Sequence, residues 1–145
     1  MMVLVDTSVW SVALRRQAGQ LTAGERAVRE ELAELIREGR ARLIGPVRQE
    51  VLSGIRTEAQ YQRLRQHLRA FPDPQLAVED YEEAAQANNR CRAQGVSGSA
   101  IDFLICAIAM RRNWPVFTTD RDFLNYARVL PISLYRPRES GDGPG

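Results

Sequence analysis

The feature that most constrains the fold is the alternation of short apolar segments with longer helical segments along the chain. Each apolar segment contains valine or isoleucine and is followed by a polar residue or a glycine, which is typical of a buried strand. We expect strands at residues 2–5, 41–44, 115–118 and 132–135. Strands separated by helices favour the α/β class, with a small, mainly parallel sheet flanked by helices.

Helices are predicted from the spacing of apolar residues and from residues that commonly begin helices. Thr57 and Ser99 are typical N-cap residues, and Pro46 suits a first helical turn because its missing N–H is not needed there. The expected helices cover residues 24–39, 57–70, 79–94, 100–112 and 120–128, with shorter ones around Trp10 and after Pro46.

The length of 145 residues and the hydrophobic content of 44% suit one domain. We expect this domain to cover residues 1–136, and the tail at residues 137–145, rich in Pro and Gly, to be disordered. No apolar run reaches the roughly 18 residues needed to cross a bilayer. Because no secretory signal precedes Asp6, we expect a cytoplasmic location, where Cys91 and Cys106 are buried free thiols.

The basic residues exclude several classes of enzyme. All 20 are arginines, so Schiff-base enzymes, Walker-A phosphate loops and lysine-dependent phospho-aspartate enzymes are excluded. His67 is the single histidine, so one chain cannot form a histidine-rich zinc site. The net charge of +2 is too small to indicate a nucleic acid or a membrane by itself. The available chemistry is that of carboxylates, hydroxyls, amides and guanidinium groups.

Acidic residues stand where expected strands end, or just inside the helices that follow them. They are Asp6, Glu50, Asp102 and Asp120, with Asp122 beside the last. In open α/β sheets the carboxyl ends of the strands form the usual ligand crevice, so we expect these acids to converge. Two carboxylates about 5 Å apart repel by about 3 kcal/mol at an effective dielectric constant of about 20. Four of them therefore need a cation, and oxygen ligands favour Mg²⁺ or Mn²⁺.

Each acid also has a purely structural interpretation. Asp102 forms a capping-box pattern with Ser99, and Asp122 forms one with Thr119. Glu50 fits a solvated helix face equally well. Asp102 is the hardest to explain in this way, because its neighbours are apolar and an unpaired buried carboxylate is costly.

Other polar residues suit a phosphate-containing substrate. Thr7, Ser8 and Thr119 offer hydroxyl contacts to a ligand or to a metal-bound water. A basic segment contains Arg56, Arg63, Arg65, Arg69 and His67, and it is either a nucleic-acid-binding rim or an ordinary solvated helix face. Such a set of acids and bases suits metal-assisted hydrolysis of a phosphodiester.

Four ordered motifs carry a resemblance to a known family. They are Val3-Leu4-Val5-Asp6-Thr7-Ser8, Pro46-Val47-x-x-Glu50-Val51-Leu52-x-Gly54, Ala100-Ile101-Asp102-x-x-Ile105-x-Ala107 and Thr118-Thr119-Asp120-x-Asp122-Phe123. In this order they resemble the PIN-domain family, and within it the VapC-type toxins of bacterial and archaeal toxin–antitoxin pairs. The resemblance covers residues 2–135.

The resemblance implies a PIN-like fold and a Mg²⁺- or Mn²⁺-dependent endoribonuclease. Asp6, Glu50, Asp102 and Asp120 would hold the metal, Asp122 would be an auxiliary acid, and Thr7 and Thr119 would be hydroxyl neighbours. The family also implies an RNA substrate, a homodimer and a cognate antitoxin protein.

Two other readings of the sequence stay open. One is a non-catalytic PIN-like binding or regulatory module whose acids serve as helix caps. The other is a phosphatase-like α/β enzyme with Asp6 as nucleophile. The missing lysine argues against the phosphatase-like enzyme, and so does Ser8, which stands where a second acid is expected.

Overall fold

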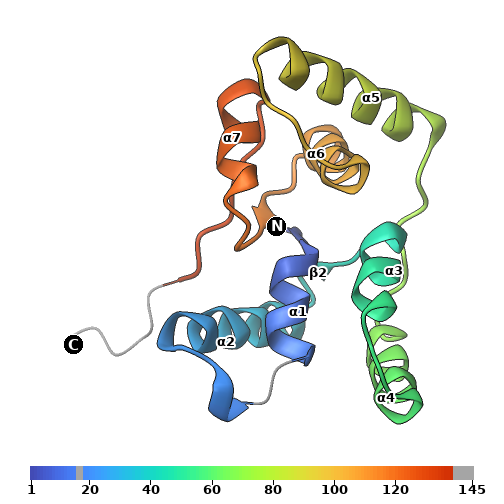
Figure 1. The fold of residues 1–145 in the computed structure, drawn as a ribbon, viewed down its shortest axis with the longest axis vertical. Coiled ribbons are helices and arrows are strands. Elements are labelled where there is room, and N and C mark those ends of the chain that lie inside the picture. The colour runs from blue at the N-terminus through green and yellow to red at the C-terminus, as the bar shows by residue number, and fades with distance from the viewer. Residues whose placement is uncertain (16–17, 139–145) are drawn as a thin grey trace.

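The computed structural model describes residues 1–15 and 18–138, and most of the tail that we expect to be disordered lies outside this range. Figure 1 shows the arrangement of the elements. Their order is β1 (Val3–Val5), α1 (Thr7–Arg15), a 3₁₀ turn (Ala18–Gln20), α2 (Ala23–Arg37), β2 (Ala41–Arg42), α3 (Gly45–Ser53), α4 (Glu58–Leu68), α5 (Val78–Ala93), α6 (Ala100–Arg112), β3 (Val116–Phe117) and α7 (Asp122–Val129).

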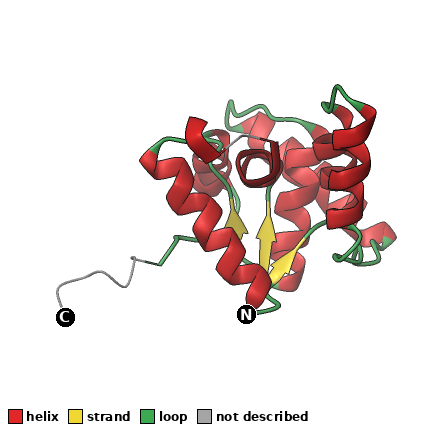
Figure 2. Cartoon of the chain, turned by 90° about the horizontal axis from the view of Figure 1, so that it is seen from below, coloured by secondary structure: helices red, strands yellow, loops and turns green. Residues whose placement is uncertain are grey.

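The sheet is small and parallel, as predicted. Its strand order is β2-β1-β3, so the first strand of the chain lies in the centre. Leu4 pairs with Arg42 on one side and with Val116 on the other. Figure 2 shows the strands pointing in one direction with helices packed around them. The carboxyl ends of all three strands therefore meet at the same edge of the sheet.

The predicted strand at residues 132–135 is wrong in its extent. Only one isolated parallel bridge forms, between Val116 and Leu134. Two backbone bonds accompany it, from Val116 N–H to Ser133 O (2.8 Å) and from Tyr135 N–H to Val116 O (2.7 Å). Pro131, just before this segment, has no N–H to donate, and β3 itself has only two residues, so there is little backbone left to pair.

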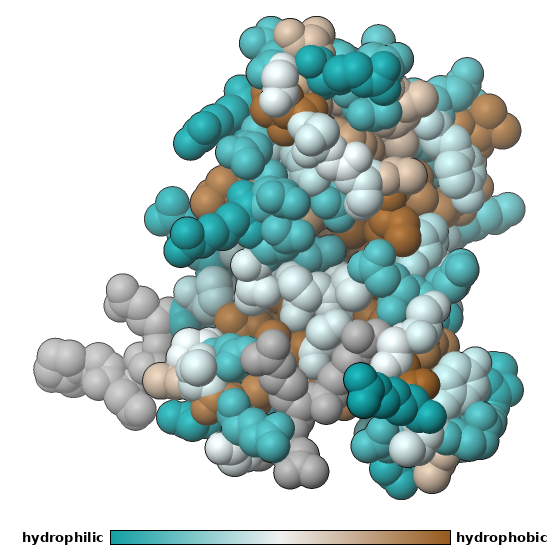
Figure 3. Space-filling view, viewed as in Figure 1, coloured by the Kyte–Doolittle hydropathy of each residue, from teal (hydrophilic) through white to brown (hydrophobic). Residues whose placement is uncertain are grey.

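The core explains why β1 has no polar residue. All three of its residues are fully buried, because helices cover the sheet. The helix α6 is buried over seven consecutive residues, from Phe103 to Ala109, and packs along α5. Cys91 and Cys106 are buried free thiols, as predicted. On the face seen in Figure 3, hydrophobic residues form small separate patches among hydrophilic ones. None of the helices in the described ranges is long and apolar enough to span a membrane.

The buried acid Asp80 links α5 and α6. Asp80 is only 2% exposed, and its Oδ2 accepts the backbone N–H of Ala77 (2.8 Å) at the start of α5. Its Oδ1 lies 3.0 Å from the Nε of Arg111, and its Oδ2 lies 3.8 Å from a nitrogen of Arg112. Asp80 thus caps α5 and pairs with the last turn of α6.

A second buried acid anchors the segment that follows the last strand-like residues. Glu31 on α2 is 7% exposed and accepts hydrogen bonds from the Tyr135 hydroxyl (2.9 Å) and from the Arg138 backbone N–H (3.1 Å). The Arg138 guanidinium also binds both Glu31 and Glu38. Residues up to Arg138 are therefore attached to α2.

This anchor predicts a pH-dependent stability. Burial by itself raises the pKa of Glu31, but the bonds from Arg138 and Tyr135 outweigh it and hold the pKa below its ordinary value of 4.5. Such a group stabilises the fold above the unfolded pKa, and this contribution is lost as the pH falls through the folded pKa. We expect Glu31→Gln to lower the melting temperature by several degrees at pH 7 and by much less at pH 3. Glu34→Gln, an exposed acid on α2, is the control, and an equal loss at both pH values would contradict the prediction.

Candidate metal centre

Asp6 is the residue at which the central strand ends. Its backbone N–H still donates to Phe117 O (2.9 Å), so β1 and β3 remain paired up to this point. Its Oδ2 accepts hydrogen bonds from the hydroxyls of Ser8 (2.7 Å) and Thr118 (2.8 Å). The side chain is held inside the fold, with only 4% of the residue exposed. This burial raises the pKa of Asp6, although the hydrogen bonds from Ser8 and Thr118 act in the opposite direction.

The loop after β3 is folded onto the same hydroxyl groups. Thr118 Oγ1 accepts the backbone N–H of Asp120 (3.0 Å), and Ser8 Oγ accepts that of Thr119 (3.0 Å). Asp120 Oδ1 in turn accepts the backbone N–H of Asp122 (2.9 Å). These bonds connect the carboxyl ends of β1 and β3 and fix where Asp120 and Asp122 lie.

Thr118 contacts both Asp6 and Asp120, a role that was not predicted from the sequence. Hydroxyl roles were predicted for Thr7, Ser8 and Thr119 instead. Thr118 is the last residue of an expected strand, as Val5 is before Asp6, so its position could have indicated a place at the carboxyl edge of the sheet. The hydroxyl of Thr7 is buried and has no hydrogen-bond partner among residues 1–15 and 18–138, and Thr119 takes part through its backbone N–H.

Asp102 lies in the first turn of α6 and is half-buried. Its backbone N–H donates to Ser99 Oγ (3.1 Å), and its Oδ2 accepts from the Tyr126 hydroxyl (2.6 Å). Burial raises the pKa of Asp102 most, and the negative charges of Asp6 and Asp120 raise it further. Asp102 therefore interacts electrostatically with Asp6 and with Asp120.

The two predicted capping boxes have different outcomes. Ser99 caps α6 as predicted, but the Asp102 carboxylate bonds to Tyr126 rather than completing the box. The prediction for Thr119 and Asp122 is wrong. The helix α7 begins only at Asp122, after an N-cap at Arg121 that has no side-chain bond. The physical reason is that Asp120 accepts the N–H of Asp122, which places the turn before the helix.

Three carboxylates come together at this edge of the sheet. Among the described residues, ligand oxygens of Asp102, Asp120 and Asp122 all lie within 4.8 Å of one another. Of the other predicted ligands, Asp6 is not part of this group, and neither is Glu50. Glu50 lies on α3, which follows the edge strand β2, and its side chain is on the exposed surface of the protein. Asp122, which the resemblance implied only as an auxiliary acid, belongs to the group itself.

The donor set fits a small divalent cation. All three groups are carboxylates, the hard oxygen ligands that Mg²⁺ and Mn²⁺ prefer. In the part of the chain that the structure describes, no arginine forms an ion pair with any of the three. Asp120 and Asp122 are exposed, so a bound ion has access from solvent. Without a cation the group is a local excess of negative charge.

This excess charge predicts that one neutral substitution stabilises the metal-free protein. At 4.8 Å, two carboxylates repel by about 1 kcal/mol in water and by about 3 kcal/mol at a dielectric constant of about 20. Asp120→Asn keeps an oxygen that can accept the Asp122 N–H, and it removes the charge. We expect the metal-free melting temperature to rise by about 4 °C in calorimetry with EDTA. Glu30→Gln, an exposed acid on α2, should leave it unchanged. A lower melting temperature for Asp120→Asn would favour the capping interpretation.

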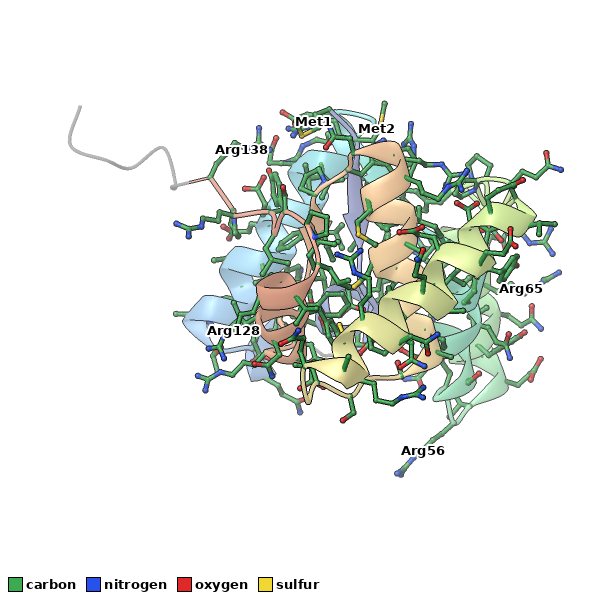
Figure 4. All side chains as sticks on the ribbon, turned by 90° about the horizontal axis from the view of Figure 1, so that it is seen from above. Met1, Met2, Arg56, Arg65, Arg128 and Arg138 are labelled. Atoms are coloured by element: carbon green, nitrogen blue, oxygen red, sulfur yellow. The ribbon has the colours of Figure 1, made fainter. Side chains whose placement is uncertain are left out.

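The predicted basic segment lies on α4 and next to its two ends. Arg63 and His67 line a shallow hollow of about 280 Å³ on α4. Figure 4 shows Arg56 at the opposite end of the molecule from Met1 and Met2. Strand β1 begins next to Met2 and runs toward the end where Arg56 lies. Arg56 thus lies at the same end as the carboxylate group. A larger cavity of about 520 Å³, between β2 and residues 70–74, contains none of the predicted metal ligands.

Comparisons with solved structures support this fold. A crystal structure of FitAcB from Neisseria gonorrhoeae is similar with a TM-score of 0.72 and 22% identity, covering 94% of this chain and 98% of that chain. A structure of VapBC2 from Rickettsia felis bound to a promoter DNA fragment has a TM-score of 0.67 and 14% identity, covering 93% and 98%. A toxin-antitoxin complex from Klebsiella pneumoniae has a TM-score of 0.60 and 19% identity, covering 83% and 89%.

The family comparison extends over most of the chain. None of the curated proteins matches the chain. The family model described as PIN domain matches residues 3–129, which include every acid of the candidate site. This chain belongs to the PIN domain family.

Proposed function

We propose that this chain is a divalent-metal-dependent endoribonuclease that acts as the toxin of a toxin–antitoxin pair. The observation that carries the proposal is the group of Asp102, Asp120 and Asp122, whose ligand oxygens lie within 4.8 Å at the carboxyl edge of a PIN-domain sheet. PIN domains are generally nucleases, and a carboxylate group of this kind suits phosphodiester hydrolysis.

The residues of the chain have distinct roles in this proposal. Mg²⁺ or Mn²⁺ would be held by Asp102, Asp120 and Asp122. Asp6 would add a further negative charge near the ion, since its charge already acts on Asp102. Glu50 remains a ligand predicted from its position in the sequence and from the family resemblance. The bound ion would supply an activated water and a positive charge for the phosphate. The hydroxyls of Ser8 and Thr118 hold Asp6 in place.

Two of the similar structures support the biological role. One is a toxin-antitoxin complex, and the other is VapBC2 bound to a DNA fragment from its promoter. By analogy we propose RNA as the substrate, a cognate antitoxin as the protein partner, a homodimer as the assembly and the cytoplasm as the location. Expression of the chain in a bacterial host should then arrest growth, and co-expression of its cognate antitoxin should restore it.

The direct test is cleavage of a cellular RNA pool by the purified chain, freed of any antitoxin. We expect discrete products with Mn²⁺ or Mg²⁺ and none with EDTA. Binding of Mn²⁺ is measured in parallel on the same preparation. Folded protein that binds Mn²⁺ but leaves every RNA intact would contradict the endoribonuclease.

The alternative is a non-catalytic PIN-like module that binds nucleic acid or regulates a partner. It is favoured by the hydrogen bonds that the side chains of Ser99 and Asp120 accept from backbone N–H groups, because they give residues at this site a structural role in a helix cap and in a turn. A chain that folds but shows no specific Mn²⁺ or Mg²⁺ site would support this module over the enzyme.

A further inference from the structure

The Tyr126 hydroxyl makes a contact that neither the motifs nor the metal group explain. It donates a hydrogen bond of 2.6 Å to Oδ2 of Asp102, across 24 positions of the sequence. The residue is fully buried on α7, between the rings of Phe103 (5.2 Å between centroids) and Phe123 (5.1 Å). The ring is therefore fixed by packing, and its hydroxyl reaches one acid of the carboxylate group.

Gly98 makes room for this hydroxyl. A Cβ atom built on Gly98 would lie 2.3 Å from the Tyr126 hydroxyl oxygen and 2.8 Å from two carbons of the ring. These distances are too short for any side chain. The loop before α6 thus accepts Tyr126 only because residue 98 has no side chain, and Ser99, the next residue, is the N-cap of the helix that carries Asp102.

The arrangement constrains the Asp102 carboxylate on two sides. The backbone of Asp102 is held by Ser99, and its Oδ2 is held by Tyr126. A carboxylate in the first turn of a helix otherwise rotates among several rotamers, and each would place its oxygens differently toward Asp120 and Asp122. Partners that orient a metal ligand in this way are a general feature of metal sites.

We propose that Tyr126, admitted by Gly98, is a positioning residue that orients Asp102 for divalent-metal binding. This inference rests on the proposed function, because it assumes that the group of Asp102, Asp120 and Asp122 holds the ion. The role assigned to Tyr126 is exerted through Asp102, to which its hydroxyl donates. The loss of its hydroxyl leaves the ligand in place but lets it rotate.

The first test is Tyr126→Phe, which removes the hydroxyl and keeps the ring contacts with Phe103 and Phe123. We expect the affinity for Mn²⁺, measured by electron paramagnetic resonance of the free ion, to fall about ten- to hundredfold. The Mn²⁺ concentration for half-maximal RNA cleavage should rise by the same factor, whereas kcat at saturating Mn²⁺ changes little. A role in packing alone would lower the melting temperature without this selective change.

The chain offers a matched control in Tyr135. Its hydroxyl also donates to a buried acid, Glu31 (2.9 Å), but it lies outside the carboxylate group. Tyr135→Phe removes the same chemical group and should leave the affinity for Mn²⁺ unchanged.

The second test disrupts the same hydrogen bond by a substitution at Gly98. Gly98→Ala would force the Tyr126 hydroxyl away from Asp102, so it should also weaken Mn²⁺ binding about tenfold or more. In the Tyr126→Phe background the same change should have little further effect on affinity, because the hydrogen bond is already lost. Gly24→Ala is the control, since a Cβ there has no neighbour closer than 4.0 Å.

The outcomes separate this inference from the proposed function. A wild-type chain that binds and cleaves with Mn²⁺, alongside an unchanged affinity in folded Tyr126→Phe, overturns the positioning role and leaves the nuclease intact. A wild-type chain that binds Mn²⁺ but cleaves no RNA overturns the nuclease, while the affinity comparison still decides the role of Tyr126. A wild-type chain without any Mn²⁺ site overturns both.

Discussion

Replacing Asp102 by Asn is expected to reduce RNA cleavage about a thousandfold or more while the chain stays folded. Asp102 belongs to the carboxylate group and is the member that Tyr126 orients. The asparagine keeps the backbone N–H that donates to Ser99 and an oxygen that can accept from Tyr126. It removes the negative charge that a divalent cation needs, and a loss of about 4 kcal/mol in the transition state corresponds to about a thousandfold in rate.

The measurement is the rate of RNA cleavage with Mn²⁺, together with Mn²⁺ binding and the melting temperature of the variant. Asp73→Asn is the control. Asp73 is an aspartate that lines the 520 Å³ cavity, pairs with Arg48 and is not a member of the carboxylate group. Cleavage by Asp102→Asn at the rate of the wild type would remove Asp102 from the catalytic group and return it to helix capping.

The largest expected effect on stability comes from Asp80. Asp80→Ala removes an acid that is 2% exposed, caps the start of α5 and pairs with Arg111 at 3.0 Å. Removing one partner of a buried pair typically costs 3–5 kcal/mol, and we expect about 3 kcal/mol because the Arg111 side chain is 39% exposed and keeps part of its hydration. For a chain of this size the melting temperature should fall by about 10 °C.

Urea denaturation monitored by circular dichroism measures this loss. Glu82→Ala, an exposed acid on the same helix, is the control and should change the unfolding free energy by less than about 0.5 kcal/mol. A loss below about 1 kcal/mol for Asp80→Ala would mean that the ion pair is already well solvated. Below its melting temperature the variant should cleave RNA normally, because Asp80 lies outside the carboxylate group.

Much of the fold follows from local signals in the sequence. The helix α6 begins and ends where it was predicted, because Ser99 caps its first turn and Asn113 takes the left-handed conformation (φ 56°) at its end. The parallel sheet was also predictable, since its strands are short apolar segments separated by helices. The segment at 132–135 has the same local pattern and still forms only one bridge, because pairing depends on the length of the neighbouring strand and on Pro131.

The candidate site was also predicted only in part from the sequence. The sequence by itself predicted that Asp6, Glu50, Asp102 and Asp120 converge near the carboxyl edge of the sheet, and that such acids suit a hard divalent cation. Only the tertiary structure decided that Asp122 joins Asp102 and Asp120, that Glu50 lies outside the group, and that the hydroxyls of Tyr126 and Thr118 donate to Asp102 and Asp6. Capping and strand formation depend on neighbours in the sequence, whereas these contacts join residues up to 112 positions apart, and their geometry is set by how the helices pack.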